Sequence, residues 1–216
     1  MNDVNLADLR KTYAQRTLSE ADVLADAVPQ FRQWLEEALS AQVDEPTALT
    51  LSTVSAFGQP SSRVVLLKGL PDEAAFLFYT NYESRKGQEL NAQPLAALNF
   101  FWPGLERQVR VEGRVEKAPA AMSTEYFQSR PRSSQLGAWA SPQSQAIDSR
   151  ETLEAREAEM AQRFAGQDPL PRPEFWGGFI LRPTRVEFWQ GRPSRLHDRI
   201  CYELIEGSWK ISRLAP

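Results

Sequence analysis

The chain has 216 residues, of which 42% are hydrophobic and 10% aromatic, which is ample for a sizeable core in one large or two small domains. Its formal net charge of −3 excludes a globally basic surface of the kind that binds nucleic acid. No run of about 18 apolar residues is present, so the sequence predicts no membrane-spanning helix. We expect no secretory signal, and the single cysteine, Cys201, fits a reducing cytoplasm because it permits no internal disulfide.

The N-terminal segment, residues 1–28, is interpreted as a flexible arm or lid, and we expect a single domain over residues 29–216. A helix is predicted to open at Pro29, because apolar residues then recur with the helical period and place one stripe on the core. The residues of this stripe are Phe31, Trp34, Leu35, Ala38 and Leu39.

Alternating apolar and polar residues predict that most of the remaining chain forms β-strands. We expect an antiparallel meander over residues 47–81, followed by strands over residues 95–102 and 106–116. Further strands are predicted after the proline-rich link at residues 168–173, including separate ones over residues 175–180 and 185–190. Together with three or four helices, these seven or eight short strands indicate a mainly β, α+β fold with peripheral helices.

A short helix is predicted between Ser84, which can cap it, and Pro94, which must end it. Arg85 and Lys86 lie in its first turn, where the helix dipole disfavours positive charge. A bound anion would offset this cost, because helix N-termini present unpaired N–H groups to phosphate. We therefore favour a phosphate-binding site here over a surface turn that binds no ligand.

A second candidate phosphate site follows the helix predicted over residues 119–128. Tyr126 and Arg130 are four residues apart and share a helical face, and Ser134 could fold back beside them. A phenol, a guanidinium group and a hydroxyl near one point can hold a phosphate. The alternative is a surface loop, since arginine next to proline is often merely exposed.

A capping box at residues 148–151 predicts another helix, which stops at Gly166.

The only histidine, His197, lies between Arg195 and Arg199. In a strand these three side chains would share one face, and such a row suits an anionic, aromatic ligand. An exposed basic edge strand is an equally good reading of the same spacing.

Several established site patterns are missing from the sequence. One histidine without paired cysteines cannot build a zinc site, so we predict no metal. There is no glycine-rich Rossmann or P-loop motif, and no Gly-x-Ser-x-Gly elbow to complete a triad with His197. Anion pockets without a nucleophile or a metal indicate that the chemistry belongs to a bound cofactor.

Nine short motifs occur in order from Arg63 to the C-terminus, and together they resemble the pyridoxine/pyridoxamine 5′-phosphate oxidase family. They are Arg63-Val-Val-Leu-Leu-Lys68, Phe78-Tyr-Thr-Asn81, Ser84-Arg-Lys86, Glu106-Arg-Gln-Val109, Ser129-Arg-Pro-Arg132, Phe175-Trp-Gly-Gly178, Phe188-Trp-Gln-Gly191, Arg195-Leu-His-Asp-Arg199 and Arg213-Leu-Ala-Pro216. The resemblance implies an antiparallel split β-barrel that forms a homodimer and binds FMN in clefts between the subunits.

The resemblance also assigns residues to the site by motif position. The residues implied for FMN are Arg63, Val64, Val65, Leu66, Leu67, Lys68, Tyr79, Thr80, Arg85, Lys86, Gln108, Gln143, Ser144, Trp189 and Arg199. The residues implied for the substrate are Arg10, Tyr13, Lys68, Tyr126, Arg130, Ser134, Arg195 and His197. Two of these, Arg195 and His197, are implied to lie against the substrate ring and to act in catalysis.

The implied reaction oxidises pyridoxine 5′-phosphate or pyridoxamine 5′-phosphate at C4′ to pyridoxal 5′-phosphate, the last step of vitamin B6 cofactor synthesis and salvage. Hydride passes to the flavin, O2 reoxidises it to give H2O2, and the amine route also releases ammonia. The alternatives are a related split-barrel flavin oxidoreductase with another substrate, such as a phenazine precursor, and a non-catalytic FMN-binding module. No nucleic acid or membrane partner is expected.

Overall fold

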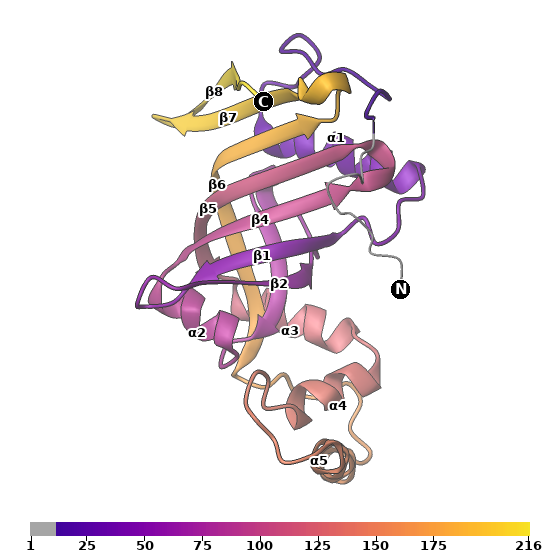
Figure 1. The fold of residues 1–216 in the computed structure, drawn as a ribbon. Coiled ribbons are helices and arrows are strands. Elements are labelled where there is room, and N and C mark those ends of the chain that lie inside the picture. Colours follow the sequence, from indigo (N-terminus) through magenta and orange to yellow (C-terminus); the bar gives the residue numbers. More distant parts are fainter. Residues whose placement is uncertain (1–11) are drawn as a thin grey trace, which may run out of the picture. The chain divides into compact units, whose positions relative to one another are not determined.

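The computed structural model describes residues 12–216, in which five α-helices and eight main strands are formed (Figure 1). The helices are α1 (Ala27–Ser40), α2 (Arg85–Ala92), α3 (Ala120–Ser129), α4 (Arg132–Ala140) and α5 (Arg150–Arg163). The strands are β1 (Ala48–Val54), β2 (Pro60–Leu66), β3 (Phe76–Asn81), β4 (Leu95–Trp102), β5 (Arg107–Lys117), β6 (Trp176–Gln190), β7 (Asp198–Ile205) and β8 (Ser208–Arg213). The mainly antiparallel β architecture predicted from the alternation is confirmed.

The strands form one sheet in the order β2-β1-β4-β5-β6-β7-β8, and β3 pairs with β6 off this path. Two compact units can be distinguished by their internal contacts. The first comprises residues up to Thr47 with Leu98–Val111 and Thr184–Pro216, and the second comprises Ala48–Ala97 and Glu112–Pro183. The predicted division into an arm over residues 1–28 and a single domain over residues 29–216 stays a prediction.

The first unit is built around helix α1, which begins at Ala27, two residues before the predicted start at Pro29. Phe31 is fully buried and its ring lies 4.7 Å from that of Phe100. The ring centroids of Trp34 and Phe188 lie 5.1 Å apart, and the two rings are nearly perpendicular. The predicted apolar stripe is confirmed for these residues but is wrong for Leu39, which is 53% exposed because it lies in the last turn of the helix.

The second unit contains the β1–β2 hairpin, in which Ala48 pairs with Leu66 and Val54 with Pro60. Strand β3 pairs with the first half of β6, from Phe76 opposite Leu181 to Asn81 opposite Trp176. A cluster of buried apolar side chains packs helices α3 and α4 and the segment after α5 together. Its members are Phe127, Leu136, Phe164, Leu170 and Trp176.

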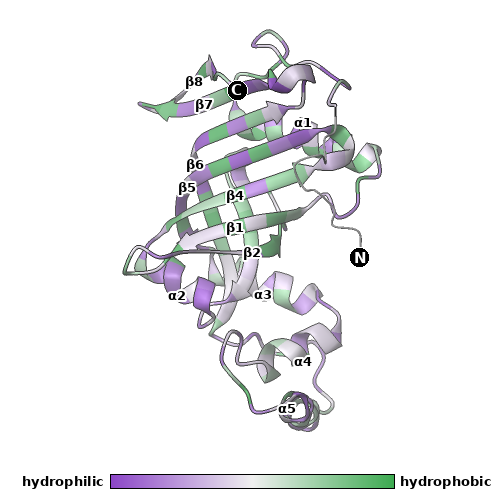
Figure 2. Ribbon diagram, viewed as in Figure 1, coloured by the Kyte–Doolittle hydropathy of each residue, from purple (hydrophilic) through white to green (hydrophobic). Residues whose placement is uncertain are grey.

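Two elements differ from the sequence prediction. Residues 132–140 form helix α4, where a loop was expected. Strand β6 runs unbroken from Trp176 to Gln190, where two strands were expected (Figure 2 colours the strands by hydropathy). Pro183 falls between the residues of β6 that pair with β3 and those that pair with β7, so its missing N–H interrupts neither of these two ladders.

Within the described residues, no helix combines the length and the apolar character that crossing a membrane requires.

Candidate active site

A cavity of about 480 Å³ lies in the second unit and gathers many of the residues predicted for the site. Its wall includes the cations Lys68, Lys86 and Arg130, and no carboxylate is among its lining residues in the described part of the chain. The complete lining is Val64, Val65, Leu66, Lys68, Tyr79, Thr80, Lys86, Tyr126, Arg130, Pro131, Ser134, Gln143 and Trp176. A concave site rich in donors and without acidic groups suits an anionic ligand.

Lys86 reaches this cavity from the first turn of α2. Ser84 caps that helix as predicted, because its side chain accepts a hydrogen bond from the Gly87 amide and donates one to the carbonyl of Asn81. The Lys86 ammonium group donates to Gln143 Oε1 at 2.8 Å and to Thr80 Oγ1 at 3.2 Å. Burial and the nearby charge of Arg63 lower the pKa of Lys86 to about 8. An anion placed here would raise the pKa of this amine again and so favour its charged form.

Arg130 reaches the cavity from the C-terminal end of α3. Its guanidinium group lies over the ring of Trp176, 4.8 Å from the centroid, and burial lowers its pKa. One guanidinium nitrogen, Nη1, is buried and has no hydrogen-bond partner among the described residues. Leaving a buried donor of a charged group unsatisfied is costly, so this nitrogen fits an oxygen of a bound phosphate.

Helices α3 and α4 bring Tyr126 and Ser134 to the same cavity as Arg130, which agrees with the fold-back predicted from their spacing. Tyr126 stacks on Tyr79 with ring centroids 4.0 Å apart and an interplanar angle of 16°. Burial and the neighbouring Tyr126 raise the pKa of Tyr79 to about 12, so its phenol stays protonated at neutral pH.

Arg63 and Arg85 do not line this cavity, although both were predicted to contact the cofactor. Each is paired with Glu89, whose carboxylate lies 3.2 Å from Arg63 Nη2 and 2.9 Å from Arg85 Nε. Two other predicted residues also lie outside the lining: Leu67 is buried, and Ser144 is exposed with a φ of 70°.

Among the predicted residues of the first unit, Tyr13 and His197 lie around Trp189. The rings of Tyr13 and His197 lie 5.7 Å and 4.6 Å from that of Trp189. His197 Nδ1 accepts a hydrogen bond from the amide of Arg192 at 3.1 Å, and partial burial together with the charge of Arg195 lowers the pKa of His197. Gln108 is half-buried on β5, and Arg10 lies outside the described residues.

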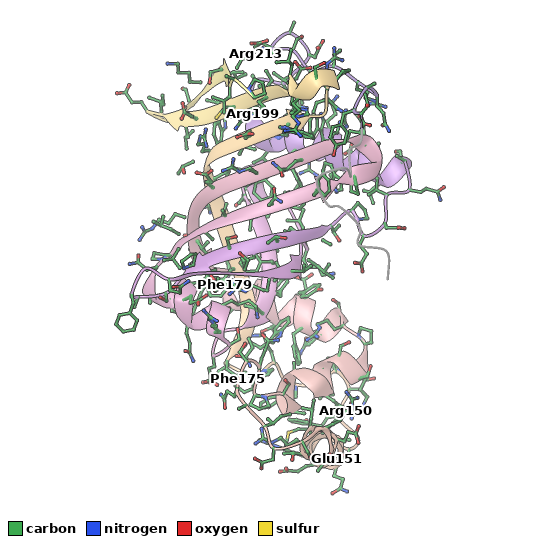
Figure 3. All side chains as sticks on the ribbon, viewed as in Figure 1. Arg150, Glu151, Phe175, Phe179, Arg199 and Arg213 are labelled. Atoms are coloured by element: carbon green, nitrogen blue, oxygen red, sulfur yellow. The ribbon has the colours of Figure 1, made fainter. Side chains whose placement is uncertain are left out.

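The predicted row of Arg195, His197 and Arg199 on one strand face is wrong. Strand β7 begins only at Asp198, and Pro193–Arg195 forms a 3-10 turn in which Ser194 and Arg195 have positive φ angles of 57° and 61°. Of the three residues only Arg199 belongs to the strand, where it precedes Ile200, the residue that pairs with Arg213 of β8 (Figure 3). Its guanidinium group is held by Glu187 through two hydrogen bonds of 2.9 Å.

Sequence reasoning missed three residues that shape these sites. Trp176 and Pro131 line the cavity, and Glu89 holds two arginines beside it. Trp176 had a signal in the motif Phe175-Trp-Gly-Gly178, which was used for the family resemblance and as a strand but was given no role in the site. Glu89 had none, because an acid four residues after Arg85 reads as an ordinary exposed helix pair.

Comparison with known proteins finds two family models that match successive parts of the chain. A family model described as pyridoxamine 5′-phosphate oxidase matches residues 35–164, and one described as the C-terminal dimerisation region of pyridoxine 5′-phosphate oxidase matches residues 176–216. A pyridoxine/pyridoxamine 5′-phosphate oxidase of Cupriavidus pinatubonensis is 58% identical over 98% of this chain and 99% of its own. One from Synechocystis sp. is 56% identical over the full length of both chains.

Solved structures show the same fold. The crystal structure of PhzG from Burkholderia lata, in complex with tetrahydrophenazine-1-carboxylic acid, superposes with a TM-score of 0.87 at 30% identity and covers 95% of this chain and all of its own. A pyridoxamine 5′-phosphate oxidase-related, FMN-binding protein of Nostoc punctiforme superposes with a TM-score of 0.69 at 19% identity, over 86% of this chain and 97% of its own.

Proposed function

Because this chain belongs to the pyridoxamine 5′-phosphate oxidase family, we propose that it oxidises pyridoxine 5′-phosphate or pyridoxamine 5′-phosphate at C4′ to pyridoxal 5′-phosphate. The structural observation that carries this proposal is the cavity with three cations, no carboxylate in its described lining, and an unsatisfied buried nitrogen of Arg130. Phosphorylated vitamers supply the anion that such a cavity requires.

The enzyme is a flavoprotein that uses FMN and works as a homodimer. FMN, when bound, supplies the acceptor for the hydride that leaves C4′ and is reoxidised by O2, which becomes H2O2. The protein itself binds the two phosphates and stacks the substrate ring on the flavin ring, so that the reacting groups are held at contact distance.

The cavity residues divide into two sets by the phosphate they hold. Lys68, Tyr126, Arg130 and Ser134 bind the phosphate of the substrate. Lys86, assisted by Arg63, binds the phosphate of FMN, and a bound dianion would raise the lowered pKa of Lys86 again. The remaining predicted FMN residues, Gln108, Gln143, Ser144, Trp189 and Arg199 among them, complete the flavin site.

The group around Trp189 supplies the residues that face the substrate ring. His197 is neutral near pH 7 because its pKa is lowered, and its Nδ1 accepts the amide hydrogen of Arg192. Its proton is therefore on Nε2, which makes that nitrogen a hydrogen-bond donor toward the ring. Arg195 orients the reacting carbon and assists the removal of the proton from the hydroxyl or amino group that C4′ carries.

A solved relative with 30% identity holds a tetrahydrophenazine carboxylic acid, so a different substrate is the competing function. The phosphate-binding set of Lys68, Tyr126, Arg130 and Ser134 favours the phosphorylated vitamer. We place the enzyme in the cytoplasm, and its single cysteine is consistent with this.

The experiment that tests the catalytic assignment is steady-state kinetics of the Arg195→Leu and His197→Asn variants. Each is expected to lower kcat/KM for pyridoxamine 5′-phosphate at least tenfold while FMN remains bound. Wild-type kcat/KM in both variants would withdraw the two assignments. Oxidation of a phenazine precursor in preference to either vitamer would overturn the substrate itself.

A further inference from the structure

A buried carboxylate holds the basic cluster beside the cavity together. Glu89 lies on α2 and its side chain is 6% exposed. Its Oε1 accepts from Arg85 Nε at 2.9 Å, and its Oε2 accepts from Thr53 Oγ1 at 2.5 Å and from Ser61 Oγ at 2.7 Å. Arg63 Nη2 approaches the same Oε2 at 3.2 Å. One side chain thus joins helix α2 to both strands of the β1–β2 hairpin.

The two hydroxyl groups in this network have their orientation set by Glu89. An ionised carboxylate can only accept, so Thr53 and Ser61 must both donate to it. Their lone pairs then face Arg63, which donates to Thr53 through Nη1 and to Ser61 through Nη2, both at 2.5 Å. Glu89 therefore fixes the guanidinium plane of Arg63 through one direct contact and two relayed ones.

The charge of Glu89 persists over the whole working range of pH. Burial opposes its ionisation, but hydrogen bonds from Thr53, Ser61, Arg85 and Arg63 outweigh that effect and lower its pKa to about 2. The carboxylate offsets one of the three positive charges of Arg63, Arg85 and Lys86. The cluster keeps a net positive charge for an anion, while the repulsion among its cations is reduced.

We propose that Glu89 is a positioning residue for the cofactor phosphate: held by Arg85, it orients Arg63 toward Lys86, so that the cluster is assembled before FMN binds. This inference rests on the proposed function, because it takes FMN as the ligand of the cluster. Donors that are already oriented lose less entropy when the ligand arrives, which is how a residue without contact to the ligand can raise affinity.

The test measures the dissociation constants of FMN and of riboflavin for the apoprotein by quenching of flavin fluorescence. Riboflavin has the same ring but no phosphate, so the ratio of the two constants reports the phosphate site alone. The Glu89→Gln variant is expected to raise the Kd of FMN at least tenfold and to leave that of riboflavin within about twofold. The matched control is Glu154→Gln, which breaks an exposed pair with Arg150 of the same spacing on α5 and should change neither constant.

A second variant guards against misfolding of Glu89→Gln. Ser61→Ala removes one relay hydroxyl and keeps the buried charge paired, and it should raise the Kd of FMN by a smaller factor, again with riboflavin unchanged. Equal losses for FMN and riboflavin in both variants would show a purely structural residue and overturn the proposal, as would unchanged FMN affinity. Turnover of wild-type enzyme with pyridoxamine 5′-phosphate is a separate measurement, so its failure would reject the substrate without altering these ratios.

Discussion

The lowered pKa of Lys86 makes FMN affinity depend on pH in a defined direction. With a pKa of about 8 in the ligand-free protein, Lys86 is charged at pH 7 and mostly neutral at pH 9. The FMN phosphate is a dianion throughout this range, because its second pKa is about 6. Binding above pH 8 must therefore recharge the amine, and the Kd of FMN is expected to rise about tenfold per pH unit there.

The size of the effect is limited by the strength of one charge pair. At 4 Å and an effective dielectric constant of 20, that pair is worth about 4 kcal/mol. Lys86 is only partly buried, and solvent screening reduces this to about 1–2 kcal/mol, or roughly 5- to 30-fold in Kd. The Lys86→Met variant should show this loss already at pH 7 and should have lost the pH dependence.

The assay is titration of apoprotein with FMN and with riboflavin between pH 7 and 9.5. Riboflavin binding should stay flat over this range in both proteins. The control variant is Lys117→Met, which removes an exposed lysine that lies over the ring of Tyr82 and outside the cavity lining. An FMN Kd that does not change with pH in the wild type, or that rises equally for riboflavin, would refute the link between Lys86 and the phosphate.

Three further changes test other parts of the structure. Arg130→Met should raise KM for pyridoxamine 5′-phosphate at least tenfold without affecting turnover of unphosphorylated pyridoxamine, and thermal unfolding should show no loss of stability because an unpaired buried donor disappears. Gly87→Ala should lower the free energy of unfolding by about 1–3 kcal/mol, since a Cβ would lie 2.3 Å from the carbonyl oxygen of Tyr82; an unchanged urea midpoint would contradict this. Glu89, with its native pKa of about 2, stabilises the fold above its ordinary value of 4.5 and loses that effect as the pH falls toward 2, so the urea stabilities of wild type and Glu89→Gln should converge progressively between about pH 4.5 and pH 2.

The strands and the cavity residues were largely predictable because both depend on short-range patterns. Alternation of apolar residues locates β1 and β5 to within a few residues, and a continuous apolar run locates β4. The spacing of Tyr126, Arg130 and Ser134 brings them to one wall, and the cap at Ser84 places Lys86 at a helix N-terminus. The cap follows from the geometry of a single helix, whereas Tyr126 and Ser134 belong to two successive helices, α3 and α4, that lie close together in the sequence.

The features that could not be predicted depend on contacts distant in sequence or on backbone conformations that no propensity specifies. Arg195 adopts a positive φ, which is unusual for a residue with a side chain, so the strand expected through His197 does not form before Asp198. The sequence pattern predicts an exposed Glu89, but the hairpin that carries Thr53 packs over this residue. Its carboxylate is therefore buried and accepts a hydrogen bond from Thr53. Burial of this kind is a tertiary property.

The measurement that tests the central claim most directly is the visible absorption spectrum of purified, FMN-loaded protein. It is recorded anaerobically before and after the addition of pyridoxamine 5′-phosphate, and again after air is admitted. We expect the oxidised-flavin band to bleach with substrate, to return in air, and to be accompanied by pyridoxal 5′-phosphate and H2O2. A flavin band that stays unchanged with both phosphorylated vitamers would contradict the proposed reaction.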